Sequence, residues 1–170
     1  MSTGFLIARL VLGLALAAHG AQKLFGWFGG YGLTGTGGYF ASIGFRPGVF
    51  FALAAGLGEV GGGLLTAAGL FGPVGPALIT VVMLVAILAV HRPNGFFASS
   101  NGVEMPLLYL IGALPLAVAG PGRYSLDGLL GFPIHYPPTV PWAALAVAVL
   151  LALLNVAARR PGAAPAPSHT

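Results

Sequence analysis

Hydrophobic residues dominate five long stretches of this chain, and most polar residues lie in the segments between them. A helix needs about 20 predominantly apolar residues to cross a bilayer. Proline near the start of a stretch and Gly-Pro after its end are typical of helix boundaries. We therefore predict an all-α, polytopic membrane bundle with helices over about residues 4–25, 49–71, 73–90, 106–120 and 141–158. The fourth helix is short, and Pro115 predicts a kink in it.

The composition supports a membrane bundle and excludes several functions. Hydrophobic residues make up 57% of the chain and charged residues only 6%, with a mean hydropathy of +0.94, which is too apolar for a soluble domain. The absence of cysteine excludes a disulfide framework, thiolate catalysis and a cysteine-ligated cluster. The net charge of +4 comes without a basic stripe, so we expect no nucleic-acid partner. The first stretch contains Arg9 and His19 and follows no basic segment, so we expect a retained span rather than a signal peptide.

Basic residues predict the orientation of the spans, because cytoplasmic loops are enriched in lysine and arginine. Placing the C-terminal end of the last span in the cytoplasm collects five basic residues there: Lys23, Arg46, Arg92, Arg159 and Arg160. The loops on the other side then keep Arg123, balanced by Asp127. We therefore expect a multi-pass membrane protein whose C-terminus is cytoplasmic.

Some ionisable residues lie inside the spans, where a charge costs roughly 2.5–3.5 kcal/mol on insertion scales. His19 and Glu59 lie deepest in the cytoplasmic half. Small residues at four-residue spacing around Glu59 predict that it faces a close helix–helix contact. Arg9 is expected within reach of Glu59, and a Glu59–Arg9 or Glu59–His19 pair would offset part of the burial cost.

Other polar residues are expected to join His19 and Glu59. Lys23 lies one helical turn beyond His19 on the same face. The ends of neighbouring spans add His91, Asn101 and Glu104. The glycine- and aromatic-rich loop over residues 26–40, which includes Trp27, is expected to be irregular backbone that roofs this region.

Five short segments stand out in order along the chain: HGAQKLF (19–25), EVGGG (59–63), HRPNGFF (91–97), NGVEMPLL (101–108) and GPGRYSLD (120–127). Together, over about residues 7–130, they resemble the DoxX family of small bacterial and archaeal membrane proteins. The resemblance implies a four-helix core over residues 1–131, and the outer loop and fifth span over residues 132–160 depart from that core. The Pro/Ala-rich residues 161–170 are expected to be a disordered tail.

The resemblance implies a component of the bacterial inner membrane that is associated with redox chemistry. Some relatives are subunits of thiosulfate:quinone oxidoreductases, and others occur in oxidative-stress contexts. Six positions match the family's segments and are implied to be functional: His19, Lys23, Glu59, His91, Asn101 and Glu104.

Our leading hypothesis is a quinone site. A quinone head group needs hydrogen-bond donors and a proton path, and histidine suits both tasks. We predict His19 and Glu59 as catalytic residues that move protons, with six further candidates for ligand binding: Lys23, His91, Asn101, Glu104, Arg9 and Trp27. Electrons would come from a partner, because no bound redox group is evident in the sequence. Whether the chain is a subunit of a quinone-linked oxidoreductase stays open.

Two alternatives remain. His19 and His91, with Glu59 as a further candidate, are alternative ligands for haem or a metal, although His19 is deep, His91 is superficial and no haem-attachment motif is present. Apart from this alternative, the sequence predicts no metal site. The chain is alternatively a non-catalytic assembly subunit that contacts lipid and docks on other membrane or redox proteins, or on itself. Structural interpretations remain as well: His19 and Glu59 as a structural ion pair, Lys23 as a membrane anchor, Arg9 as a residue that reaches the outer interface, His91 and Glu104 as complements to helix dipoles, and Asn101 as a turn residue. Tyr109 is interpreted as a packing residue.

Overall fold

Helices form all the regular structure among residues 2–160, the part of the chain that the computed structural model describes. The bundle contains five long helices: α1 (Ser2–Phe25), α3 (Gly48–Ala68), α4 (Val74–Ala86), α5 (Glu104–Ala119) and α7 (Thr139–Ala157). Four helical segments are long and apolar enough to cross a membrane: Thr3–Phe25, Gly48–Ala68, Val74–Asn94 and Thr139–Ala157. α5 is apolar but shorter. The predicted all-α membrane bundle is confirmed, and the tail over residues 161–170 lies outside the described residues.

The third span extends beyond α4 through a wide π turn (Ile87–His91) and a 3₁₀ turn (Arg92–Asn94). π turns inside helices are rare and occur frequently at functional sites. A second 3₁₀ turn (Ala98–Ser100) leads into α5. This connection places His91 beside the start of α5.

The glycine-rich loop is more ordered than expected, because it contains a 3₁₀ turn (Trp27–Gly29) and the helix α2 (Gly32–Ser42). Glycine disfavours helix formation, which is why the sequence suggested irregular backbone. Tertiary packing overrides this preference. A β-carbon at Gly37 would lie 2.8 Å from the Val49 side chain, and one at Gly48 would strike the carbonyl of Gly37. The glycines therefore let α2 lie directly against the start of α3.

Close packing of α1 against α3 also depends on glycine. A β-carbon at Gly13 would lie 2.7 Å from the backbone nitrogen of Ala67, and one at Gly20 would lie 2.7 Å from the carbonyl oxygen of Gly56. Glu59 lies on this contact with 3% of its surface exposed, so the predicted helix–helix contact at Glu59 is confirmed. Next to this contact, four buried residues form the centre of the core: Leu16, Ile79, Met83 and Ala113.

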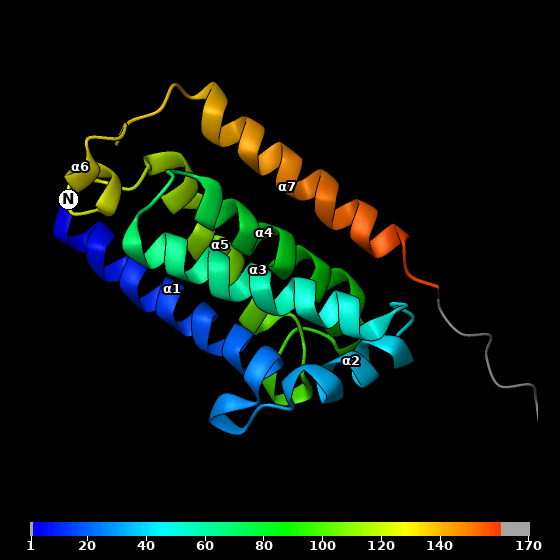
Figure 1. The fold of residues 1–170 in the computed structure, drawn as a ribbon. Coiled ribbons are helices and arrows are strands. Elements are labelled where there is room, and N and C mark those ends of the chain that lie inside the picture. The colour runs from blue at the N-terminus through cyan, green and yellow to red at the C-terminus, as the bar shows by residue number, and fades with distance from the viewer. Residues whose placement is uncertain (1, 161–170) are drawn as a thin grey trace, which may run out of the picture.

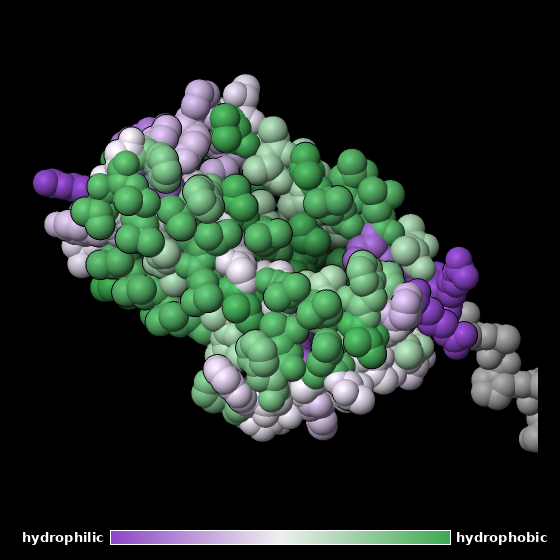
Figure 2. All heavy atoms as spheres, in the orientation of Figure 1, coloured by the Kyte–Doolittle hydropathy of each residue, from purple (hydrophilic) through white to green (hydrophobic). Residues whose placement is uncertain are grey.

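The arrangement of the helices gives the bundle two distinct ends (Figure 1). α2 lies at one end, and α6 (Leu126–Leu130) lies beside the N-terminus at the other. α7 runs along the outside of the bundle and packs on α4. Hydrophobic residues cover most of the face shown in Figure 2, and the strongly hydrophilic residues gather near its ends. A protein with this surface is membrane-embedded and contacts lipid.

Candidate functional site

A cavity of about 750 Å³ lies at the α2 end of the bundle. Ligand pockets in proteins measure roughly 300–1,000 Å³ and are mostly apolar with a few convergent polar groups. The apolar wall comes from several helices and includes Leu16, Val82, Met83, Val85, Ala86 and Met105. Aromatic side chains on the α2 side include Tyr31, Tyr39, Phe40 and Phe45. The polar lining consists of His19, Gln22, Lys23, Thr36, Glu59, His91, Asn101 and Tyr109, beside the hydroxyls of Tyr31 and Tyr39.

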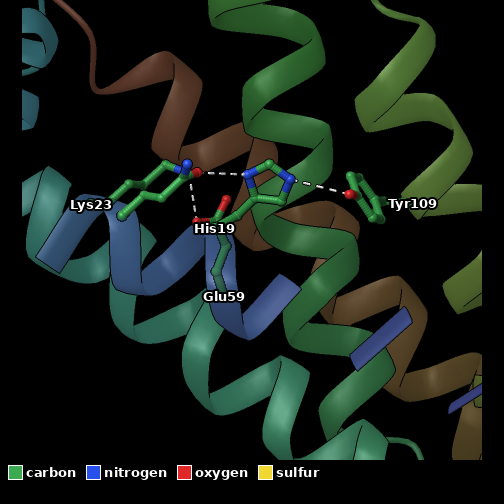
Figure 3. Close-up of polar contacts among 5 residues, drawn as sticks. His19, Lys23, Glu59 and Tyr109 are labelled. Carbon is green, nitrogen blue, oxygen red and sulfur yellow. Dashed lines mark hydrogen bonds and ion pairs between the residues drawn. The ribbon is translucent and has the colours of Figure 1, made fainter. Parts of the chain in front are cut away.

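His19 is the centre of a hydrogen-bonded chain that joins α1 to α5 (Figure 3). The amide nitrogen of Gln22 donates to the carbonyl of Phe28 at 3.2 Å, which directs the amide oxygen of Gln22 toward Nδ1 of His19 at 3.0 Å. An amide oxygen only accepts, so Nδ1 carries the proton. In the neutral ring, Nε2 therefore accepts from the hydroxyl of Tyr109 at 3.1 Å. Protonation of His19 reverses this last bond, because Nε2 then becomes a donor.

An ion pair between Lys23 and Glu59 lies beside this chain (Figure 3). Nζ of Lys23 donates to Oε2 of Glu59 at 2.5 Å. The Glu59 side chain is 4% exposed and the Lys23 side chain 28% exposed, so the lysine connects a buried carboxylate to the surface. The expected Glu59–Arg9 pair is therefore wrong. His19 interacts electrostatically with Glu59, but the salt bridge is made to Lys23. Arg9 lies 14 residues before Lys23 on α1, which is about 21 Å along the helix.

His91 and Asn101 meet at the edge of the cavity. Nδ1 of His91 donates to the backbone carbonyl of Asn101 at 2.8 Å, and the side chain of Asn94 donates to the same oxygen at 3.3 Å. Asn101 adopts a left-handed conformation (φ 60°), which asparagine tolerates better than most residues. Asn101 thus holds the His91 ring through its backbone.

Three predicted site residues do not line the cavity. Oε2 of Glu104 accepts from the backbone nitrogen of Ala98 at 2.7 Å, so this carboxylate stabilises the turn before α5. Trp27 is 60% exposed and packs beside Phe25, with ring centroids 5.1 Å apart. Arg9 belongs to the α6 end of the bundle. Its guanidinium is buried and donates to the backbone carbonyl of Tyr124.

Asp127 organises that opposite end. Its carboxylate is completely buried and accepts from the backbone nitrogens of Phe71 and Gly72 at 2.9 and 2.8 Å. Asp127 also interacts electrostatically with Arg9. Arg9 and Asp127 therefore link the connection between α5 and α7, which contains α6, to the start of α1 and the end of α3. These contacts lie away from the cavity.

The sequence does not reveal the two hydrogen-bond partners of His19. It favours packing as the role of Tyr109, yet Tyr109 pairs with His19 across the cavity. It assigns no role to Gln22, although this residue orients the His19 ring. Gln22 lies three residues after His19, and side chains at this spacing share a helix face, so that spacing was a usable signal. Tyr109 offered no comparable signal, because its partner is 90 residues away.

The described part of the chain contains no cluster of side chains that could together bind a metal ion. No group of three or more His, Cys, Asp or Glu side chains within residues 2–160 is placed to share a metal ion. Both ring nitrogens of His19 also already have hydrogen-bond partners.

Comparison with known proteins points to one family. The sequence pattern of the DoxX family matches residues 4–92, which is 89 of the 170 residues. The chain is also similar to an uncharacterized protein of Haemophilus influenzae, with 35% identity over 52 residues. That match covers 31% of this chain and 34% of the other, so the chain spans about a third of the length of the relative it matches. No solved structure matches the chain.

Proposed function

The chain belongs to the DoxX family, and from this membership we propose that its cavity binds a membrane quinone and exchanges protons with it. One observation carries the proposal: a largely apolar cavity of about 750 Å³ contains both a His–Tyr pair and a Lys–Glu pair. Apolar walls suit the ring and its hydrocarbon tail, and donors such as the Tyr109 hydroxyl suit the ring carbonyls.

Proton transfer follows from the hydrogen-bonded chain. Reduction of a quinone to a quinol consumes two electrons and two protons. When His19 is protonated, its Nε2 donates to Tyr109, which frees the hydroxyl proton for a quinone oxygen. The hydroxyl gives this proton to the quinone and regains one from His19, so the net donor is the imidazolium.

The Lys23–Glu59 pair is the proposed source of the second proton: the Lys23 ammonium gives a proton to the reduced quinone and takes one back from water, while Glu59 stays ionised. Lys23 is partly exposed, and its carboxylate partner lies inside the bundle, so the pair connects water with the cavity. The two electrons come from a partner redox protein, with this chain as the quinone-binding subunit. We place the cavity near the cytoplasmic face of a bacterial inner membrane, with a cytoplasmic C-terminus, because the basic residues favour this orientation.

A haem site is the weaker candidate for the same residues. Axial ligation by His19 would require breaking its bond to Gln22 or to Tyr109. Purified protein that shows a Soret band would favour haem over quinone.

Quinone binding to purified protein in lipid nanodiscs tests the proposal directly, with ubiquinone-1 as the probe and calorimetry as the measurement. We expect Tyr109→Phe to weaken binding about five- to tenfold, because it removes one hydrogen bond worth about 1 kcal/mol. His19→Ala removes both hydrogen bonds of the imidazole, to Gln22 and to Tyr109, and should weaken quinone binding further.

Tyr124→Phe is the matched control, because Tyr124 is half exposed, lies at the α6 end and contributes its backbone carbonyl to Arg9. It should bind ubiquinone-1 as the unmodified protein does. Equal affinity of the His19→Ala variant and the unmodified protein, with both folded, would contradict the proposal. So would the absence of quinone binding to the unmodified protein.

A further inference from the structure

The C-terminal end of α7 holds the segment that connects α2 to α3. Nε and Nη2 of Arg159 both donate to the backbone carbonyl of Ile43, at 3.0 and 2.9 Å. The backbone nitrogen of Arg160 donates to the carbonyl of Gly44 at 2.8 Å. Two consecutive carbonyls of this connection are therefore bonded to the two residues that follow the end of α7, 116 residues later in the chain.

The next residue of the connection, Phe45, forms part of the cavity wall. Its side chain is 1% exposed, and it packs against Phe40 and Phe51 with ring centroids 5.7 and 5.0 Å apart. The guanidinium carbon of Arg159 lies 5.5 Å from the centroid of the Phe45 ring, within the range of a cation–π contact. Arg159 thus contacts both the backbone before Phe45 and its aromatic face.

Phe45 also separates two cavities. It lines the main cavity of about 750 Å³ and a smaller one of about 100 Å³. The smaller cavity lies toward α7 and is apolar apart from Asn155. Phe40, Ala55, Val82 and Val85 line both spaces as well, so the two adjoin at this wall.

We infer that Arg159 is a positioning residue for the ligand cavity: it holds Phe45 in place and thereby sets the fit of the ligand's hydrocarbon chain. The polar groups that suit a quinone head, His19 and Lys23, lie on α1. Phe45 lies on the apolar side toward α4 and α7. The residues that follow α7 therefore support the wall of the binding site without lining it, and the identity of the ligand as a quinone rests on the proposed function.

Two quinones that share a head group separate positioning from general destabilisation. Decylubiquinone carries a hydrocarbon chain, and ubiquinone-0 has none. In nanodiscs, Arg159→Ala should weaken decylubiquinone binding about tenfold and change ubiquinone-0 binding less than about threefold. Arg159→Lys keeps the positive charge and can still donate one hydrogen bond to the Ile43 carbonyl. It should therefore recover part of the decylubiquinone affinity that Arg159→Ala loses.

Arg160→Ala is the matched control, because alanine retains the backbone nitrogen that bonds Gly44. It should bind both quinones as the unmodified protein does. Hydrogen–deuterium exchange supplies a readout that needs no ligand. The amides of residues 43–45 all donate to carbonyls of α2, and they should exchange faster in Arg159→Ala than in Arg160→Ala.

Three outcomes would overturn the inference: unchanged exchange at residues 43–45, unchanged decylubiquinone affinity, or equal losses for both quinones. If the unmodified protein binds neither quinone, the proposed function is refuted. The exchange rates then decide the inference alone, since faster exchange in Arg159→Ala still supports the positioning of Phe45.

Discussion

Replacing Lys23 with methionine tests whether the Lys23–Glu59 pair stabilises the bundle, because methionine keeps the length of the side chain and removes its charge. The substitution leaves the Glu59 carboxylate 4% exposed and without its partner at 2.5 Å. Removing one partner of a buried ion pair costs about 3–5 kcal/mol. Lys23 is 28% exposed, so water screens part of the interaction, and we expect a loss of about 3 kcal/mol.

The opposite substitution should cost less. Glu59→Gln retains an oxygen that accepts from Lys23, and the lysine can extend toward water, so only the charge-assisted part of the bond is lost. We expect about 1–1.5 kcal/mol. The double variant contains no unpaired charge in the bundle, and its destabilisation should be at least about 1 kcal/mol smaller than the sum of the single losses.

Reversible unfolding of the purified protein in mixed micelles measures these free energies for the four proteins of the cycle. Losses that add within about 0.5 kcal/mol would refute the reasoning, since independent sites add to within that amount. A Lys23→Met variant as stable as the unmodified protein would refute it as well.

Three other predictions concern packing and hydrogen bonds away from the pocket. Gly13→Ala should destabilise the bundle by about 1–3 kcal/mol, because its β-carbon meets the Ala67 backbone; Gly61→Ala, which meets nothing within 4 Å, should be neutral or stabilising in the same unfolding assay. Asp127→Asn leaves one backbone nitrogen facing an amide NH₂ and removes the counter-charge of Arg9, so it should lower the unfolding free energy by about 2–3 kcal/mol and leave ubiquinone-1 affinity unchanged. Glu104→Ala should cost about 1 kcal/mol through the lost bond to the Ala98 nitrogen, and calorimetry should show unaltered quinone binding; a loss of binding would return Glu104 to the site.

The positions of the spans follow from hydropathy along the chain. An apolar stretch such as residues 141–158 predicts α7 (Thr139–Ala157) to within a few residues, because a helix is the structure that satisfies its own backbone in lipid. The packing of Glu59 against α1 was also predictable, since the small residues around it leave room for a second backbone. α2 was not predictable in this way, because its glycines disfavour a helix until α3 packs against it.

Three residues of the candidate site were evident from residue type alone. A histidine, a lysine and a glutamate inside apolar stretches are costly, so His19, Lys23 and Glu59 stood out, and the cavity brings them together. Glu104 and Arg9 are also ionisable, and Trp27 is an aromatic residue of the neighbouring loop, but all three bond or pack elsewhere. Residue type gives the cost of burial, but it does not say which atoms lie close enough to offset that cost.

The sequence by itself determined that this chain is a helical membrane protein of the DoxX family with ionisable groups inside the bundle, because hydropathy and motif order are properties of the chain in one dimension. Only the tertiary structure decided that Glu59 pairs with Lys23, that Tyr109 completes the His19 chain and that Arg159 reaches the segment before Phe45. These pairs join residues 36 to 116 positions apart. Such contacts depend on how the helices rotate and approach one another, and close packing through glycine fixes that geometry.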